Sequence, residues 1–194
     1  MHRRIIAGRS KLGVLGLSSV AVMAIAAGTL VSMALFTDDA TVDNNTFTTG
    51  TIDISTTPAT ALFNVSAMMP GDSVYGQLNV ANGGTGQLRY AMTSSSTVDS
   101  QNLADQVELE IREKAAGTCA GDFTGTVVMS TTALSAAAFG DPGAGADTDD
   151  RVLNASASEN LCFKASLPGS TDDSYQGATT TTTFTFSAEQ TANN

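Results

Sequence analysis

The clearest pattern in the chain is an alternation of apolar and polar residues over residues 107–113. Val107, Leu109 and Ile111 alternate there with charged residues. Successive side chains of a strand point to opposite faces, so the pattern predicts a strand with one buried and one solvated face. Residues 74–80 alternate in the same way. Strands with one solvated face are typical of antiparallel sheets.

Short runs of this kind recur along the chain and are separated by turn residues. They cover residues 51–54, 61–65, 74–80, 88–93, 107–113, 125–129, 161–167 and 179–186. Pro70-Gly71-Asp72 and Asn82-Gly83-Gly84 have the composition of tight turns. About eight short strands in one domain of this size predict an all-β fold, either a two-sheet sandwich or a barrel.

The stretch between residues 131 and 158 departs from the strand pattern. Ser135-Ala136-Ala137-Ala138 predicts a short helix within residues 131–139. Residues 140–150 are rich in Gly and Asp, which indicates a surface loop. We therefore expect a variable Gly/Asp-rich insertion near residues 131–158.

The first 34 residues have the three zones of a helical secretion signal. Residues 1–11 are basic, residues 12–30 are apolar, and Ser32-Met33-Ala34 supplies small residues before a cleavage site. This arrangement predicts cleavage between Ala34 and Leu35 and export from the cell. An uncleaved membrane anchor is the alternative, because the apolar run approaches the ~20 residues that span a bilayer.

Cleavage would leave a strongly acidic chain of 160 residues. It would carry five basic and nineteen acidic side chains, a formal charge of −14. Such a chain repels the phosphates of nucleic acids and the head groups of anionic lipids. The balance therefore argues against nucleic-acid partners and suits a soluble protein of the cell exterior.

Catalytic chemistry has few candidate residues. The one histidine, His2, lies in the signal, so the mature chain offers no Ser-His-Asp or Cys-His catalysis and no histidine-bearing zinc site. We expect a protein that is not an enzyme and has no cofactor. Asp141, Asp147, Asp149 and Asp150 suggest either a weak calcium site or a solvated acidic loop, and their spacing is not that of an EF-hand.

Two cysteines, Cys119 and Cys162, are present in the chain. An even number of cysteines in an exported protein favours a disulfide, and two separate buried thiols are the alternative. The bridge would close a ring of 44 residues. Chain entropy assigns such a ring about 4 kcal/mol of stabilisation.

The segment that follows the signal resembles a known family. The residues that carry the resemblance are Ala34, Phe36, Asp38, Thr49, Gly50, Thr51, Ile52, Asp53 and Ile54. They are similar to the N-terminal signature of the TasA/camelysin family of secreted biofilm-fibre proteins. The similarity continues through the Pro-Gly-Asp turn at 70–72, the Val-x-Asn strand end at 80–82 and the Tyr-containing strand at 88–90.

The resemblance implies a jelly-roll-like antiparallel β-sandwich over residues 51–194, preceded by an extended segment at 35–50. It also implies a dedicated signal peptidase as a partner during export. Some relatives are described as metalloproteases, but the chain has no His-Glu-x-x-His motif, so this activity is not transferred.

The function that we predict is assembly into extracellular biofilm-matrix fibres. A strand released by cleavage can pair with an exposed sheet edge of the next copy, so the chain would be its own partner in a head-to-tail polymer, alongside other matrix components. The candidate donor side chains are Phe36, Ala40, Val42 and Phe47, and the first three share one face of a strand.

Two alternatives stay open at this point. Residues 35–50 are either the donor strand, the first strand of their own domain, or a disordered leader. The alternative function is a monomeric cell-surface module that binds polysaccharide. Sugar sites are rich in aromatic residues, whereas the chain has no tryptophan and only Tyr75, Tyr90 and Tyr175.

Overall fold

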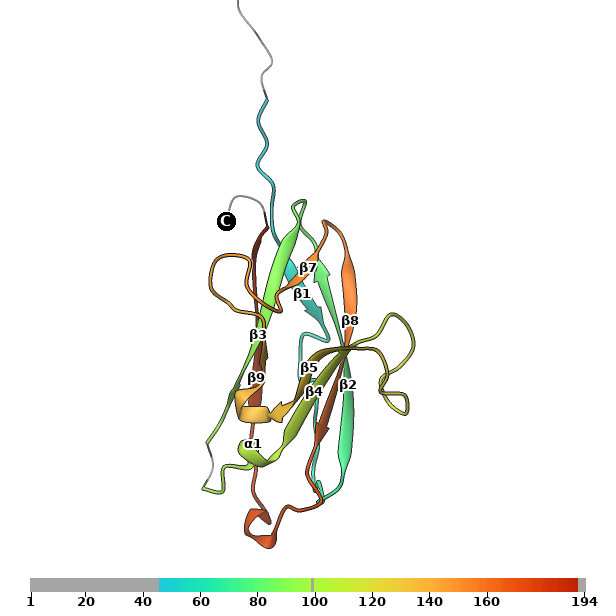
Figure 1. Cartoon of the computed structure of the whole chain (residues 1–194), viewed down its shortest axis with the longest axis vertical. Coiled ribbons are helices and arrows are strands. Elements are labelled where there is room, and N and C mark those ends of the chain that lie inside the picture. The colour runs from blue at the N-terminus through green and yellow to red at the C-terminus, as the bar shows by residue number, and fades with distance from the viewer. Residues whose placement is uncertain (1–45, 99, 192–194) are drawn as a thin grey trace, which may run out of the picture. The chain divides into compact units, whose positions relative to one another are not determined.

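The computed structural model describes residues 46–98 and 100–191, which form two β-sheets (Figure 1). Sheet A has five strands in the spatial order β1-β2-β8-β4-β5. These strands are β1 (Ile54–Thr57), β2 (Ser73–Asn82), β8 (Ser158–Ser166), β4 (Glu108–Glu113) and β5 (Thr126–Ala133).

Sheet B is arranged around β3 (Leu88–Ser96). Strand β9 (Thr182–Gln190) pairs with β3 along its whole length, and β6 (Ala138–Phe139) and β7 (Arg151–Leu153) pair with separate parts of the other side of β3. The short helices are α1 (Leu103–Gln106), η1 (Leu134–Ala136) and η2 (Asp173–Tyr175).

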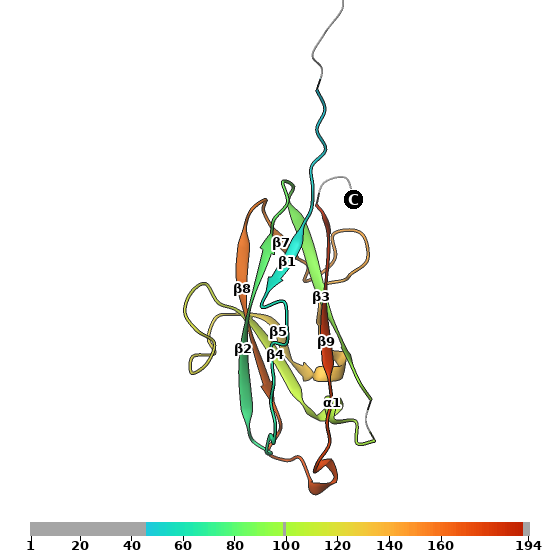
Figure 2. The same cartoon turned by 180° about the vertical axis from the view of Figure 1, so that it is seen from behind.

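Every strand pair in the described residues is antiparallel, and the two sheets form the layers of a sandwich (Figures 1 and 2). The all-β antiparallel class expected from the sequence is confirmed. The expected signal helix and most of the extended segment lie outside the described residues.

The core between the sheets follows the alternation that the sequence shows. In β4, Leu109 and Ile111 have no exposed surface, and in β2 the side chains of Leu78 and Val80 are buried. Sheet B contributes residues of β3 and the inner residues of β9. The largest fully buried side chains are those of Tyr90, Phe163, Leu88, Met92, Leu109, Ile111, Leu161, Val80, Asn82 and Cys162.

Two strand predictions at the beginning of the domain need correction. Residues 61–65 form no strand. The adjacent Leu62 and Phe63 are both half-buried, whereas in a strand their side chains would point to opposite faces. The strand expected at residues 51–54 begins only at Ile54. The backbone of Thr51 instead pairs with a turn, described below.

The helix predicted within residues 131–139 is also largely wrong. Strand β5 continues to Ala133, and only the three residues of η1 are helical before β6 begins. Leu134, Phe139 and Leu153 are buried in the core, so much of the expected insertion is structural rather than peripheral. The predicted Gly/Asp-rich loop is limited to the residues between β6 and β7. The domain boundaries themselves stay a prediction.

Candidate assembly surfaces

The sequence-predicted assembly residues lie mostly outside the described part of the chain. This holds for the cleavage residues Ala34 and Leu35 and for the donor candidates Phe36, Ala40 and Val42. The remaining donor candidate, Phe47, is 94% exposed. Residues 47–50 form no strand and lead away from the sheets (Figure 1).

The motif at residues 49–54, which carries the family resemblance, fixes the end of the N-terminal segment to the domain. The carbonyl of Thr51 accepts hydrogen bonds from the backbone N–H groups of Thr85 and Gly86, both at 3.0 Å, and the carbonyl of Asp53 accepts one from Gly83 at 2.8 Å. A Cβ atom at position 84 would lie 2.3 Å from the Thr51 carbonyl oxygen, so only glycine permits this approach. The motif therefore anchors the chain on the turn between β2 and β3.

Strand β2 has an unpaired stretch of edge. On one side it pairs with β8 from Ser73 to Ala81, whereas on the other side β1 pairs with it only from Asn79 to Asn82. Along residues 73–78, no described strand faces this second side. An edge of this kind presents backbone N–H and C=O groups to which another strand can add.

The chain between β1 and β2 lies beside this unpaired edge (Figure 2). We call residues 58–68 the cover segment. Its Leu62, Phe63 and Met68 are half-buried and pack against the core. A Cβ atom at Gly76 would lie 2.6 Å from Leu62 Cγ and 3.1 Å from Phe63 Cε1, so both side chains lie directly on Gly76. Within the described chain, the cover segment makes no backbone–backbone hydrogen bond.

Sheet B has a longer open edge at β9. Among the described strands, β9 pairs with β3 alone. Its inner side chains Phe184 and Phe186 contact the rings of Phe163 and Tyr90, with centroid distances of 5.5 and 6.1 Å. Sheet A also ends at β1 and β5, so the unpaired stretch of β2 and the β9 edge are two of several edges in the described strands to which another strand can add.

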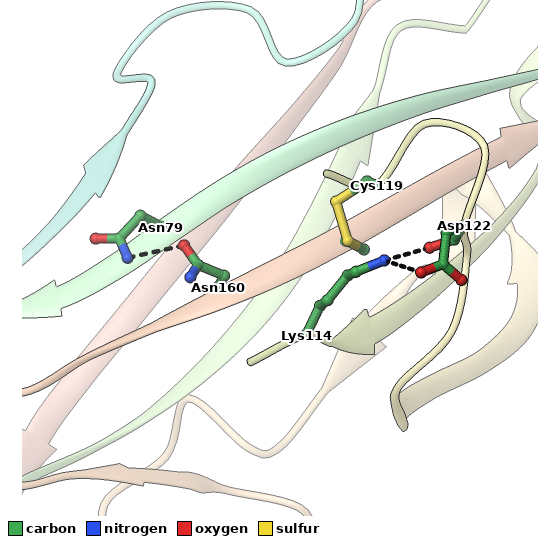
Figure 3. Close-up of a disulfide and its surroundings, with 6 residues drawn as sticks. Asn79, Lys114, Cys119, Asp122 and Asn160 are labelled. Carbon is green, nitrogen blue, oxygen red and sulfur yellow. Dashed lines mark hydrogen bonds and ion pairs between the residues drawn. A yellow bond between two sulfur atoms is a disulfide. The ribbon is translucent and has the colours of Figure 1, made fainter. Parts of the chain in front are cut away.

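The predicted disulfide between Cys119 and Cys162 is present (Figure 3). The Cα atoms are 5.4 Å apart, and both cysteines are buried. Cys162 belongs to β8, and Cys119 belongs to the connection between β4 and β5. We call residues 115–125 of this connection the clamped loop, because the disulfide ties it to the middle of sheet A.

Further contacts fasten the clamped loop. The Nζ atom of the buried Lys114 donates to the carbonyl oxygen of Asp122 and lies 2.9 Å from its carboxylate (Figure 3). The hydrogen bond from Lys114, with one from Thr124, lowers the pKa of Asp122 below its ordinary value. The ring of Phe123 packs 5.8 Å from that of Tyr75, and the Arg112 guanidinium lies 5.2 Å from its centroid.

A polar network joins the two sheets further along β8. The hydroxyl of Tyr90 donates to Glu159 at 2.7 Å, and Arg151 donates to Glu159 and, at 2.6 Å, to Glu113. Burial, followed by the Glu159 hydrogen bond, raises the pKa of Tyr90, so this hydroxyl remains a donor. The sequence pattern did not predict this network, although Glu113 follows Ile111 on the inward side of β4 and so signalled an inward-facing charge.

The Asp residues of the loop between β6 and β7 bind the loop itself. The carboxylate of Asp150 accepts hydrogen bonds from the N–H groups of Asp141 at 2.9 Å and Asp147 at 3.1 Å, and Asp141 accepts one from Gly143. A cavity of about 40 Å³ lies under the loop, against Arg89 and Glu189. The calcium site considered from the sequence stays untested by this arrangement.

Ligand groups for a catalytic metal are not gathered in residues 46–98 and 100–191. No three His, Cys, Asp or Glu side chains of these residues form a cluster that fits a metal ion. Both cysteines are joined in the disulfide. In the same part of the chain, no helix is long and apolar enough to cross a membrane. The described residues therefore do not fit a metallopeptidase centre, and no catalytic step is derived from them.

Comparison with known proteins supports the resemblance seen in the N-terminal segment. A family model described as "Camelysin metallo-endopeptidase" matches residues 9–194, which is nearly the whole chain. No curated protein matches the chain. The match includes the anchoring motif, both sheets and the clamped loop. The chain therefore belongs to the camelysin family.

Proposed function

We propose that the protein is an exported, matrix-related structural subunit that polymerises into extracellular fibres. In this proposal, residues 35–50 of one copy add as a strand to an open sheet edge of the next copy. The contact is head-to-tail and does not close on itself, so it builds a filament rather than a ring. Family membership supports the export and the relation to the matrix.

The observation that carries the proposal is that residues 46–50, the described end of the N-terminal segment, contribute no side chain to the core. Within the described chain, the buried apolar side chains of the core come from residues beyond 77, and Ile54 is the first residue that packs against them. Phe47, an aromatic residue of the segment, is almost fully exposed. The described core is therefore built without residues 46–50, and the domain retains sheet edges that a segment of this kind can complete.

The candidate donor residues suit an added strand. Phe36, Ala40 and Val42 are separated by even numbers of residues, so they share one face of a strand with Asp38. The three apolar side chains can enter the core of the neighbour on either side of Asp38. The opposite face carries Thr41 and other polar residues that can remain in water. Removal of the signal by a signal peptidase would free this strand and so start assembly.

Comparison of two chain lengths tests the proposal. Residues 35–194 and residues 51–194 are purified and followed by light scattering and electron microscopy. We expect fibres from the longer chain and monomers from the shorter one. A longer chain that stays monomeric at high concentration contradicts the fibre function. Equal polymerisation of both chains contradicts the donor-strand mechanism but is consistent with the fibre function.

A matched pair of variants separates the two faces of the donor strand. Val42→Asp places a charge on the face that would be buried, and Thr41→Asp places the same charge on the opposite face. We expect the first variant to abolish fibres and the second to form them. Equal behaviour of the two variants would show that residues 41 and 42 are not in a strand with one buried face.

A further inference from the structure

The unpaired edge of β2 and the cover segment together point to the place where a neighbour binds. We propose that the edge at residues 73–78 accepts residues 35–50 of a second copy, and that the cover segment leaves this edge when they bind. The inference rests on the proposed function and adds to it the acceptor edge and its internal competitor.

The acceptor edge has the polar groups that a strand needs. About half of the backbone N–H and C=O groups of residues 73–78 point away from β8, toward the side on which β1 has ended. The cover segment occupies this side without backbone–backbone hydrogen bonds in the described chain. An added strand can form the main-chain ladder that the cover segment does not form.

The apolar contacts of the cover segment are of a kind that the donor can replace. Leu62 and Phe63 lie on Gly76, whose cross-strand partner is Phe163, and the ring of Phe163 meets Phe184 of β9. One aromatic and one aliphatic side chain therefore cover this part of the core. The donor face also carries one aromatic residue, Phe36, together with the smaller Ala40 and Val42, and it includes Asp38 between Phe36 and Ala40.

The cover segment has few other contacts to hold it. Of its eleven residues, seven are exposed and four are half-buried. Its end is fixed where Asp72 and Gly71 exchange backbone hydrogen bonds with Leu167, at 3.0 and 2.8 Å. Its beginning is fixed by β1. The segment between these two points can therefore move outward without breaking a strand pair.

The length of residues 35–50 and the position at which they join the domain fit binding to a neighbouring copy rather than to the same copy. Residues 35–50 span ~50 Å when extended, whereas the six-residue edge needs ~20 Å, so the remainder can bridge two copies. The segment leaves the domain beside the β2–β3 turn, where Thr51 is anchored. The acceptor edge begins at the opposite end of β2, at Ser73. Exit and entry at opposite ends give a head-to-tail repeat.

Thiol labelling of the full mature chain tests the movement of the cover segment. The variant Leu62→Cys is labelled with a maleimide before and after assembly, without reductant, so that the native cysteines stay bridged. We expect the labelling rate of the introduced thiol to rise at least tenfold in fibres, because the side chain leaves the core. Val65→Cys is the control, since Val65 is already 45% exposed and its rate should barely change.

A reversible lock tests whether the movement is required. In Leu62→Cys/Gly76→Cys, the two side chains lie close enough to form a disulfide. We expect the oxidised double variant to stay monomeric while the single Leu62→Cys variant forms fibres. Fibres from the oxidised variant, or an unchanged labelling rate at position 62 in fibres of the single variant, overturn the inference.

The outcomes separate this inference from the proposed function. If the mature chain forms fibres in which the thiol introduced at position 62 stays protected, donor-strand assembly stands and the acceptor lies at another edge, such as β9. If the wild-type chain forms no fibres, the proposed function fails and the inference fails with it. The labelling experiment does not alter Gly76, so it remains decisive if Gly76→Cys alone blocks assembly.

Discussion

The clamped loop and the cover segment lie against opposite faces of sheet A and are held in opposite ways. The clamped loop has a disulfide to β8, an ion pair between Lys114 and Asp122, and the packing of Phe123. The cover segment has half-buried side chains and no backbone–backbone hydrogen bond with described residues. One region is fastened in place, whereas the other is the region that we propose is exchanged for a strand.

This difference assigns separate roles to two regions that both connect strands. A fastened connection raises the stability of the subunit and leaves its outer face constant. In our proposal, a weakly held connection at an open edge shields apolar residues in the monomer and is displaced by the strand of a neighbour. The following predictions test each half of this comparison, beginning with the largest expected effect.

Removal of the disulfide should produce the largest loss of stability. We expect Cys119→Ser/Cys162→Ser to lower the free energy of unfolding by about 4 kcal/mol, because the open chain gains entropy when it unfolds. Urea unfolding of the mature chain measures this change. At temperatures where the variant is folded, it should still form fibres. A loss below about 1 kcal/mol would show that the other contacts of the clamped loop suffice.

Loss of the charge of Glu159 should have the next largest effect. Glu159→Gln leaves the half-buried Arg151 with a weaker partner and should cost about 2 kcal/mol. Glu110→Gln is the matched control, because its partner Arg112 is more exposed and such pairs contribute under about 1 kcal/mol. Urea unfolding compares the two. Equal losses would contradict the view that this network fastens the two sheets.

Truncation of the cover segment should lower stability slightly and speed assembly. We expect Leu62→Ala to cost about 1 kcal/mol, since the side chain is only half-buried, and to shorten the lag before fibres appear. Val65→Ala removes an exposed side chain of the same segment and should change neither quantity. Light scattering measures the lag. A longer lag for Leu62→Ala would mean that Leu62 assists assembly rather than opposing it.

The smallest effect should be a loosening of the clamped loop in acid. Because the pKa of Asp122 is lowered in the folded protein, its bond to Lys114 is fully present above the ordinary pKa. It should be lost as the pH falls through the lowered pKa. Amide hydrogen exchange of residues 115–125 measures this change, and Asp122→Asn should remove it. A transition at or above the ordinary pKa of an aspartate contradicts the assigned ion pair.

Several parts of this fold were predictable because their causes are local. The alternation around Leu109 and Ile111 follows directly from a strand with one buried face. The disulfide followed from two cysteines in a chain with an export signal. The anchoring turn was signalled by Asn82-Gly83-Gly84, although its partner, Thr51, was assigned to a strand.

Other parts depend on contacts that no local pattern encodes. Leu62 and Phe63 were interpreted as part of a strand, because the short apolar run does not reveal that its backbone lacks a partner. The pairing of Arg151 with Glu113 and Glu159 joins three strands, so it appears only once both sheets are in place. The donor residues before Phe47 lie outside the described chain, so their role remains a proposal.

The most direct test of the account is a titration of residues 51–194 with a peptide of residues 35–50, followed by amide NMR. We predict that the largest shifts and the strongest gain in exchange protection fall on residues 73–78, with chemical-shift changes also in residues 58–68 as the cover segment leaves the edge. A peptide with Phe36→Asp and Val42→Asp should produce neither effect. Changes confined to β9, or no binding at all, would contradict the assignment of the β2 edge as the acceptor.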